Sequence, residues 1–349
     1  MKFQEIEFIR GKNFINECLK QKLINNNFTK SNNPKISTII PVFNCAKTII
    51  SSIRSIQNQN ISDIEIILVN DFSNDNTSEI INELQKVDQR IQIIDNKKNM
   101  GTLYSRCIGV LSSKGKYIFS LDNDDMYFGC DIFDYIYQII IEGNFDIIGF
   151  KSVIANKNNF TIIKENPKSH HPINLTLYQP ELSRFPMNKE NLYNDIHIWA
   201  KCIRNKIYKN GINALGKERY SKFINWAEDI SMVFILFNLA HSFKFVHKYG
   251  VIHFSSNSSS SSVATTKHKI FCEIFLLDVI YSFSKNNTDK NLAVYYALNI
   301  KKTRNLTEFK KEKFYFYLIR NILIRIVKNK YIEQINKEII INNFKDFLF

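Results

Sequence analysis

Three carboxylates lie within four positions of the segment Asp122–Asp125, directly after the apolar run Gly115–Phe119. A strand that ends in clustered acids places them at the carboxyl edge of a sheet. Such a cluster repels itself, and hard cations such as Mg²⁺ or Mn²⁺, which prefer oxygen ligands, neutralise it. Because these ions commonly hold a diphosphate, the segment indicates nucleotide-linked chemistry. The alternative interpretation is a solvated turn that follows a strand.

Alternating strands and helices surround this segment, which predicts an α/β fold with a mostly parallel sheet flanked by helices. The apolar periodicity predicts strands at 36–42, 64–69, 91–94 and 116–121, and helices at 46–57, 77–87 and 102–112. Pro41 is expected to close the first strand, because proline has no donor for the ladder. Ligands of such sheets bind beyond the carboxyl ends of the strands. Polar clusters follow three of these ends: Phe43-Asn44, Asn70 to Ser73, and Asp122 to Asp125.

The second half of the chain is less regular. The sequence predicts a helix at 131–141, a strand at 145–153, a long polar loop at 155–190 and a helix at 225–239 that opens with Trp226-Ala227-Glu228-Asp229. An apolar segment at 194–208 surrounds Trp199. The serine run at 255–262 predicts a flexible loop, and the pattern from Lys267 onward is helical.

The net charge of +14 is unevenly distributed. From Lys267 onward there are 16 Lys and Arg against 8 Asp and Glu, so this region carries +8 of the total. Such a region can bind nucleic acid, an anionic membrane surface or an anionic substrate, or it can be a solvated lysine-rich face. No nucleic-acid motif accompanies it, so no nucleic-acid partner is expected. The apolar segment 314–327 either packs on the main domain or makes peripheral contact with a membrane.

The six cysteines are widely separated and form no CxxC pair, which argues against a zinc site and a disulfide framework. Reduced thiols in a reducing compartment are the simplest interpretation. The first residues include acids where a signal peptide would be basic and then apolar. No run approaches the roughly 20 apolar residues of a membrane span. A cytoplasmic protein is therefore expected, with attachment to a membrane surface as the alternative.

Four segments in order resemble the family 2 glycosyltransferases, which have a GT-A fold. They are Ile39 to Asn44, Leu68 to Asp75, Asn99-Met100-Gly101 leading to Arg106, and Leu121 to Asp125. The resemblance covers about residues 35–150 and continues more weakly through Trp199-Ala200-Lys201 and Glu228-Asp229 to about 262. It implies a transferase domain at 34–262, with a nucleotide-binding part (35–150) and an acceptor-binding part (151–262). Beyond about residue 266 the resemblance gives nothing. The sequence pattern alone predicts an amphipathic helical segment at 1–33 and a basic helical region at 267–349.

The resemblance also implies roles for single residues. Asp71 would accept a hydrogen bond from the nucleobase, and the segment Pro41 to Asn44, with Phe43, would line the same pocket. Arg106 would lie near the base or a phosphate. Asp122 would face the ribose or the metal, Asn123 would lie in the same nucleotide-sugar pocket, and Asp124 would hold the cation, Mn²⁺ or Mg²⁺. In the acidic pair Glu228-Asp229, Asp229 is the preferred base for the acceptor hydroxyl.

Three residues depart from the family pattern. Asn70 stands where an aspartate is frequent, and both Phe72 and Ala227 stand where glycine is common. None of these departures removes a proposed catalytic group, although Phe72 is expected to crowd its turn. Outside the resemblance, Asp71 can be an Asx-turn residue, Asp229 a first-turn acid favoured by the helix dipole, and Arg106 a surface arginine. Trp199 and Trp226 fit an acceptor pocket or the core, and His253 is either structural or close to the diphosphate.

The leading hypothesis is an inverting, metal-dependent hexosyltransferase. It would move a sugar from a nucleotide-diphosphate sugar, with UDP the preferred nucleotide, to a hydroxyl of a glycan, lipid or protein. A sugar nucleotidyltransferase is the first alternative, but it needs a glycine-rich basic loop that Phe43 to Lys47 does not provide. A non-catalytic sugar-nucleotide or glycan-binding module is the second alternative. The retention of both the metal acids and Glu228-Asp229 argues against that module.

Overall fold

The strands of the protein join in one ten-stranded sheet with the order β3-β2-β1-β4-β9-β6-β10-β5, while β7 pairs with β6 and β8 with β10. The structure is a computed structural model that describes residues 11–17, 28–156, 162–165, 175–184, 197–255, 266–283 and the positions 323, 337, 338 and 341. The strands are β1 (Ile36–Val42), β2 (Ile64–Asn70), β3 (Ile91–Asp95), β4 (Tyr117–Ser120), β5 (Met126–Tyr127), β6 (Ile147–Asn156), β7 (Ile162–Glu165), β8 (Thr176–Tyr178), β9 (Lys201–Arg204) and β10 (Ser242–Ser255).

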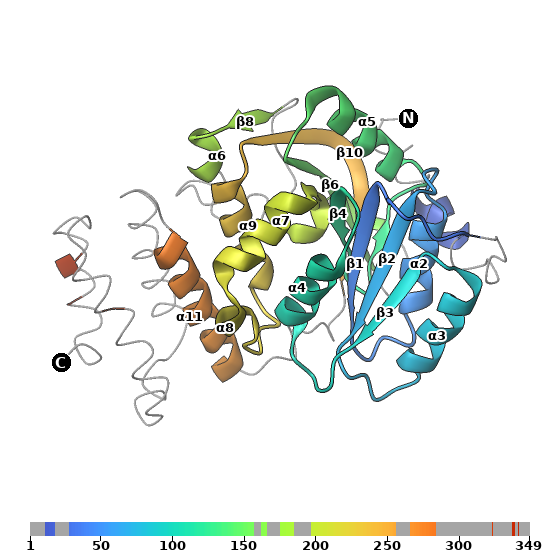
Figure 1. Ribbon diagram of the computed structural model, residues 1–349, viewed down its shortest axis with the longest axis horizontal. Helices are drawn as coiled ribbons and strands as arrows, with labels where there is room; N and C mark the ends of the chain where they lie inside the picture. Colours follow the sequence, from blue (N-terminus) through green and yellow to red (C-terminus); the bar gives the residue numbers. More distant parts are fainter. Residues whose placement is uncertain are drawn as a thin grey trace.

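Helices cover both faces of this sheet (Figure 1). They are α2 (Ile49–Gln57), α3 (Thr77–Val87), α4 (Thr102–Ser112), α5 (Ile132–Gly143), α6 (Glu181–Arg184), α7 (Asn205–Leu215), α8 (Lys217–Tyr220), α9 (Glu228–Leu239) and α11 (Thr266–Phe283), with a 3₁₀ turn at Ile198–Ala200. Helix α11 lies beside α8 and α9, away from β1–β3 (Figure 1).

The first half of the sheet is parallel, as the alternating pattern predicts. Strands β3, β2, β1 and β4 all run in one direction. Strand β9 then runs antiparallel to both β4 and β6, so β6 and its parallel neighbour β10 regain the direction of β1. The carboxyl ends of β1, β2, β4 and β10 therefore point the same way.

The period-two alternation of the strands divides the core between the two faces. Ile39, Val69 and Ile118 pack with α4, α7 and α9 in one buried cluster. Ile40, Leu68 and Phe119 point to the opposite face and pack with α2 and α5 in a second cluster. Because both faces are covered, β1 and β2 are buried along their whole length and mostly apolar, which is the property that makes them predictable from the sequence.

Strand β1 has the predicted bounds, so Pro41 lies within the strand and does not close it. Strand β1 continues to Val42, and Pro41 is in register with Val69 of β2. The backbone N–H and C=O of Ile39 point toward β4, since the carbonyl accepts from Leu121 N. Pro41 is two residues further along the strand, so its backbone groups point to the same side. Pairing with β4 stops at Ile39 opposite Ser120. The missing N–H of Pro41 therefore faces a side where no ladder partner follows.

Several predicted segments fall wholly or partly outside the described residues. Of the helical segment expected at 1–33, residues 11–17 are described and helical, whereas residues 28–33 are described and not helical. The serine run 256–262 and the segment 314–327, apart from position 323, lie outside the description. Within 155–190 the structure has the short elements β7, β8 and α6. In the described part of the chain, no helix has the length and apolarity needed to cross a membrane.

Candidate active site

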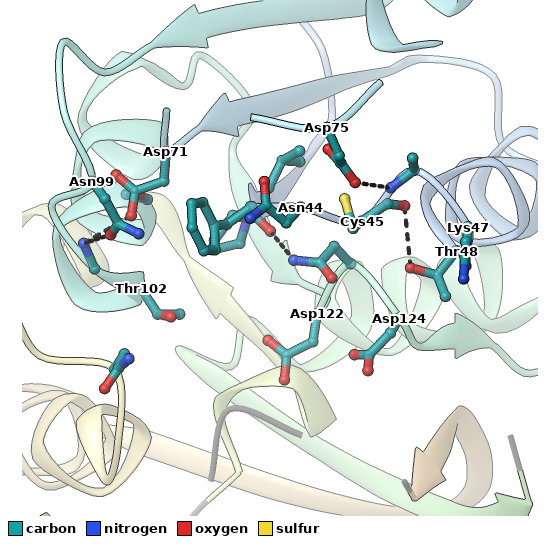
Figure 2. Close-up of a pocket in the computed structure, with 18 of the residues that line it drawn as sticks. Asn44, Cys45, Lys47, Thr48, Asp71, Asp75, Asn99, Thr102, Asp122 and Asp124 are labelled. Carbon is teal, nitrogen blue, oxygen red and sulfur yellow. Dashed lines mark hydrogen bonds between the residues drawn. The ribbon is translucent and has the colours of Figure 1, made fainter. Parts of the chain in front are cut away.

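A cavity of about 1160 Å³ opens at the carboxyl ends of β1, β2 and β4. Figure 2 shows Asp71 with Asn99 on one side of it, Lys47 and Thr48 on the other, and Asp122 with Asp124 at its floor. The lining residues are Pro41–Thr48, Asp71, Asp75, Asn76, Asn99, Gly101, Thr102, Ser105, Asp122–Asp124, Phe223, Asn225, Glu228 and His268. The three polar clusters that follow the strands thus meet in one cavity.

Asp71 is buried and holds the loop that leads from β3 to α4. Its Oδ1 accepts from the backbone N–H of Met100 (2.8 Å) and its Oδ2 from that of Gly101 (2.8 Å). The side chain of Asn96 donates a third bond of 2.8 Å. Gly101 has φ +88°, and a Cβ there would meet the Ile224 carbonyl oxygen at 3.0 Å, so only glycine fits this position without strain. Asp71 therefore shapes the loop as well as facing the cavity.

The loops after β1 and β2 are hydrogen-bonded to each other. Asn44 donates its N–H to Ser73 Oγ (3.1 Å), and its Oδ1 accepts from Asn74 N (2.9 Å). Cys45 N donates to Thr77 Oγ1 (2.9 Å), and Ala46 N to Asp75 Oδ2 (3.3 Å). These bonds fix the rim of the cavity before any ligand is present.

The acidic segment divides into half-buried members and one fully buried member. Asp122 and Asp124 line the cavity, and Figure 2 shows their carboxylates side by side. Asn123 donates its amide to Pro41 O (2.8 Å) and so ties the segment to the end of β1. Asp125 is fully buried and accepts from Phe254 N (2.9 Å) and pairs with His253 Nδ1 (2.9 Å). Asp122 and Asp124 therefore border the space where a ligand would bind, whereas Asp125 is structural.

The Asp125–His253 pair shifts the titration of both groups. Burial raises the pKa of Asp125 to about 6, although His253 opposes the rise. Asp125 raises the pKa of His253 to about 9, against the effect of burial. The imidazole stacks on Trp199 (5.4 Å between centroids, 10° between planes). His253 is therefore a fixed cation near neutral pH, and Trp199, itself 3% exposed, belongs to the core side of the site.

Arg106 is the centre of a buried ion cluster. Its side chain is 2% exposed and donates to Asp122 Oδ1 (2.8 Å), Asp229 Oδ1 (2.8 Å) and Glu228 Oε1 (3.4 Å). Burial disfavours the charge of Arg106, but the three acids outweigh it and raise its pKa. Arg106 joins the acidic floor to the start of α9; its expected place near the base or a phosphate stays a prediction.

One guanidinium faces three carboxylates, so the cluster has excess negative charge when all three acids are ionised. Burial raises the pKa of Asp229 to about 8, although Arg106 opposes the rise, and burial likewise raises the pKa of Asp122 and Glu228. The arrangement favours binding of a further cation at the cavity floor or a shared proton.

Both positions that depart from the family's glycine have left-handed backbone. Phe72 has φ +66° and Ala227 has φ +58°. Glycine adopts this region without the steric cost that a Cβ brings. Ala227 immediately precedes Glu228, so the strained residue lies directly before the first turn of α9. The resemblance therefore located two positions where the backbone requires glycine-like geometry.

Eight of the ten residues expected from the sequence line the cavity: Pro41, Phe43, Asn44, Asp71, Asp122, Asn123, Asp124 and Glu228. Arg106 and Asp229 lie behind this surface, in contact with each other. Sequence reasoning assigned no role to Lys47, Asp75, Thr102, Ser105, Phe223, Asn225 and His268, which also line the cavity. Lys47, Asp75, Thr102 and Ser105 lie within or next to the segments that resemble the family, and this position in the sequence could have identified them. No sequence pattern near His268 indicates a role. Trp226 is partly buried against the core and does not line the cavity.

The sequence matches the model of glycosyl transferase family 2 over residues 37–210. The chain is 28% identical to the uncharacterized glycosyltransferase EpsJ of Bacillus subtilis over 196 residues, which cover 56% of this chain and 54% of EpsJ. It is 38% identical over 93 residues to the GalNAc(5)-diNAcBac-PP-undecaprenol beta-1,3-glucosyltransferase of Campylobacter jejuni, covering 26% of this chain and 30% of that protein. The chain thus spans about half or less of these curated relatives.

The fold is similar to that of S. aureus TarS residues 1–349, solved in complex with UDP-GlcNAc, with a TM-score of 0.61, 15% identity, and coverage of 86% of this chain and 82% of that chain. A complex of the same fragment with UDP gives a TM-score of 0.61 over 90% of both chains, again with 15% identity. At this identity the likeness concerns the fold, which is the expected GT-A-like arrangement of a central sheet flanked by helices. The match of residues 37–210 to the family model shows that the chain belongs to glycosyltransferase family 2.

Proposed function

We propose that the protein is an inverting glycosyltransferase that moves a sugar from a nucleotide-diphosphate sugar, with UDP as the preferred nucleotide, to a hydroxyl of a glycan, lipid or protein. The observation that carries the proposal is the meeting of three groups in one cavity. Asp71 lies on one side, the Asp122–Asp124 floor lies below, and Glu228 borders the same space. Arg106 joins the floor to the acidic pair.

The nucleotide is proposed to bind at the side of Asp71. Its carboxylate already accepts from Asn96, Met100 and Gly101. Each carboxylate oxygen has two lone pairs, so Asp71 retains acceptor capacity for the imide N–H of a uracil. Phe43 lines the cavity and is 42% exposed, which makes its ring available to the base.

The cavity floor fits a divalent cation. Among the described residues no group of three or more His, Cys, Asp or Glu side chains converges in a metal-binding arrangement. Asp122 and Asp124 nevertheless offer two carboxylates on one face of the cavity. Mg²⁺ characteristically takes one or two carboxylates and completes its shell with substrate phosphates and water. When bound, Mg²⁺ or Mn²⁺ would stabilise the charge that develops on the diphosphate leaving group.

The acidic pair at the start of α9 is proposed to serve the acceptor. Inversion by direct displacement needs a base for the attacking hydroxyl. Asp229 is assigned this role in its ionised form, which Arg106 and a further cation at the cavity floor would favour against the effect of burial. Glu228 lies at the cavity surface, where it would orient the hydroxyl. Arg106 holds the Asp229 carboxylate at 2.8 Å, and Ile198 N donates to its other oxygen at 3.4 Å. These two contacts fix the position of Asp229 relative to the floor.

The proposal is tested with Asp124→Asn, which keeps the size of the side chain and removes its charge. We expect UDP with Mn²⁺ to raise the melting temperature of the wild type, and this shift to disappear in the variant. Release of UDP from a UDP-sugar should fall by about 100- to 1000-fold. Asp134→Asn on α5, outside the cavity, is the matched control. Full activity of Asp124→Asn at saturating metal would refute the assignment.

A further inference from the structure

One wall of the cavity comes from residues outside the segment 37–210 that the family model matches. Phe223 and Asn225 precede α9, and His268 lies in the first turn of α11. The Phe223 side chain is 42% exposed and lines the cavity together with polar and acidic side chains. Neither the nucleotide pocket nor the acidic cluster described above accounts for these three side chains.

The wall is firmly built. His268 Nε2 lies 2.5 Å from Asn225 Oδ1, and the rings of Phe223 and His268 are 5.3 Å apart. Leu103 N donates to Ile224 O (3.0 Å), which fixes the segment to the start of α4. Arg219 pairs with Asp278 (3.0 Å), which fastens α8 to α11. The wall therefore keeps its shape without a ligand.

The wall offers an apolar ring face beside amide and imidazole groups. Burial lowers the pKa of His268, so its imidazole is neutral at pH 7. A neutral imidazole that donates from Nε2 uses the Asn225 oxygen as its acceptor, and the Asn225 Nδ2 group then provides donors. A pyranose ring has the complementary surface, with a C–H face for the aromatic ring and hydroxyl oxygens that accept from the amide.

The position of the wall indicates that it contacts the sugar of the donor. A Cβ on Gly101 would lie 3.3 Å from the Phe223 ring, and Gly101 N is bonded to Asp71. Glu228 follows Asn225 by three residues and lines the same cavity. The wall therefore lies between the proposed nucleotide side and the proposed reacting pair, which is where the sugar of a bound donor must extend.

We propose that Phe223, Asn225 and His268 bind the sugar ring of the donor and thereby select which nucleotide sugar the protein uses. This inference rests on the proposed function. It assigns the choice of sugar to a loop and a helix that the family model does not include, whereas the nucleotide is held by residues within it.

The test compares the binding of nucleotide and nucleotide sugar by calorimetry, with UDP, UDP-GlcNAc and UDP-glucose as probes in the presence of Mn²⁺. We expect the wild type to bind one of the two nucleotide sugars more tightly than UDP. Phe223→Ala should weaken that nucleotide sugar by about fivefold to tenfold and leave UDP unchanged. Phe223→Tyr, which keeps the aromatic ring, should bind the nucleotide sugar more tightly than UDP, as the wild type does. Tyr135→Ala on α5 is the control, because Tyr135 is 41% exposed and lies outside the cavity.

The outcomes separate the two proposals. A wild type that binds none of the three probes refutes the proposed function and, with it, the sugar wall. If the wild type binds a nucleotide sugar tightly and Phe223→Ala leaves that binding unchanged, only the assignment of the wall to the donor sugar is refuted. This is also the result expected if the wall contacts only the acceptor. Equal weakening of UDP and the nucleotide sugar also refutes it, because Phe223 would then contact the nucleotide.

Discussion

The two sides of the cavity are assembled differently. On the nucleotide side, loops from neighbouring strands bond to each other, as in the contact of Asn44 with Ser73, 29 residues apart. On the side of the acidic pair, the contacts join distant parts of the chain: Arg106 meets Asp229 across 123 residues, and Asp125 meets His253 across 128. The first side is held by hydrogen bonds between backbone and side chains of one parallel unit, with the carboxylates of Asp71 and Asp75 among the acceptors. The second side is held by buried ion pairs between distant parts of the chain.

This difference implies that the two sides respond differently to substitution. Hydrogen bonds between neighbouring loops contribute about 0.5–1.5 kcal/mol each, so losing one is tolerated. Removing one member of a buried ion cluster leaves its partners uncompensated, and the cost is several kcal/mol. Substitutions on the charged side should therefore change both stability and chemistry, while those on the nucleotide side should mainly change binding.

The largest expected effect is that of Asp229→Asn. The amide cannot take the proton of an acceptor hydroxyl, so the rate of sugar transfer should fall by about 100- to 10,000-fold. Binding of UDP with Mn²⁺ should be retained, which titration calorimetry would measure. Glu228→Gln is the matched variant, and we expect a smaller loss of rate. If Glu228→Gln were the more damaging change, the two roles would have to be exchanged.

Replacement of the central cation should cost stability. Arg106→Met leaves Asp122, Glu228 and Asp229 without their guanidinium, so the free energy of unfolding in urea should fall by about 3–5 kcal/mol. Adding Asp229→Asn to this variant should recover part of the loss, because one uncompensated charge is removed. The control is Lys86→Met, since the Lys86–Glu83 pair is more than 60% exposed at both side chains and is worth about 0–1 kcal/mol. Similar losses in both variants would show that the buried cluster is not special.

The His253–Asp125 pair should make stability fall as the pH rises. The pKa of His253 is raised from 6.5 to about 9 in the folded protein, so its stabilising contribution is complete below pH 6.5 and is lost as the pH passes through 9. The difference in unfolding free energy between wild type and His253→Asn should therefore be largest near pH 6.5. Denaturant titrations in EDTA at several pH values measure it. A difference that grows with pH would contradict the assignment.

The smallest expected effect concerns the two strained residues. Ala227→Gly and Phe72→Gly each relieve a left-handed backbone conformation, which is partly offset by the greater freedom of glycine in the unfolded chain. We expect each to raise the unfolding free energy by up to about 1 kcal/mol, measured in urea. Ala46→Gly, at a residue without positive φ, is the control and should be neutral or destabilising. An equal effect at all three positions would remove strain as the cause.

The same division decides what the sequence could predict. Helices α3 and α4 have the predicted bounds, and β1 and β2 end within one residue of theirs, because both faces of this parallel unit are buried and its strands are mostly apolar. Strand β10 was not predicted. Its pairing with β6 shifts register between Val246 and Tyr249 and again between Tyr249 and Val251, so its alternation is interrupted.

Site residues follow the same rule. Asp71, Asp122 and Asp124 directly follow strands, so the fold class alone brings them to one edge. The partners of Arg106 depend on where α9 packs, and the place of His268 depends on α11. Neither packing leaves a periodic signal near Arg106 or His268, so these contacts had to be seen in three dimensions.

The bonded loops at the rim also have a kinetic and entropic consequence. Asn44, Ser73 and Asn74 are already fixed to one another, as are Asp71 and Gly101. A ligand that enters such a rim does not have to immobilise it, so little of the intrinsic binding energy is spent on ordering the chain. The backbone amides of Asn44 and Gly101 should accordingly exchange slowly with deuterated solvent even without ligand. Ordering of these described rim loops should therefore not limit the rate at which a small nucleotide associates.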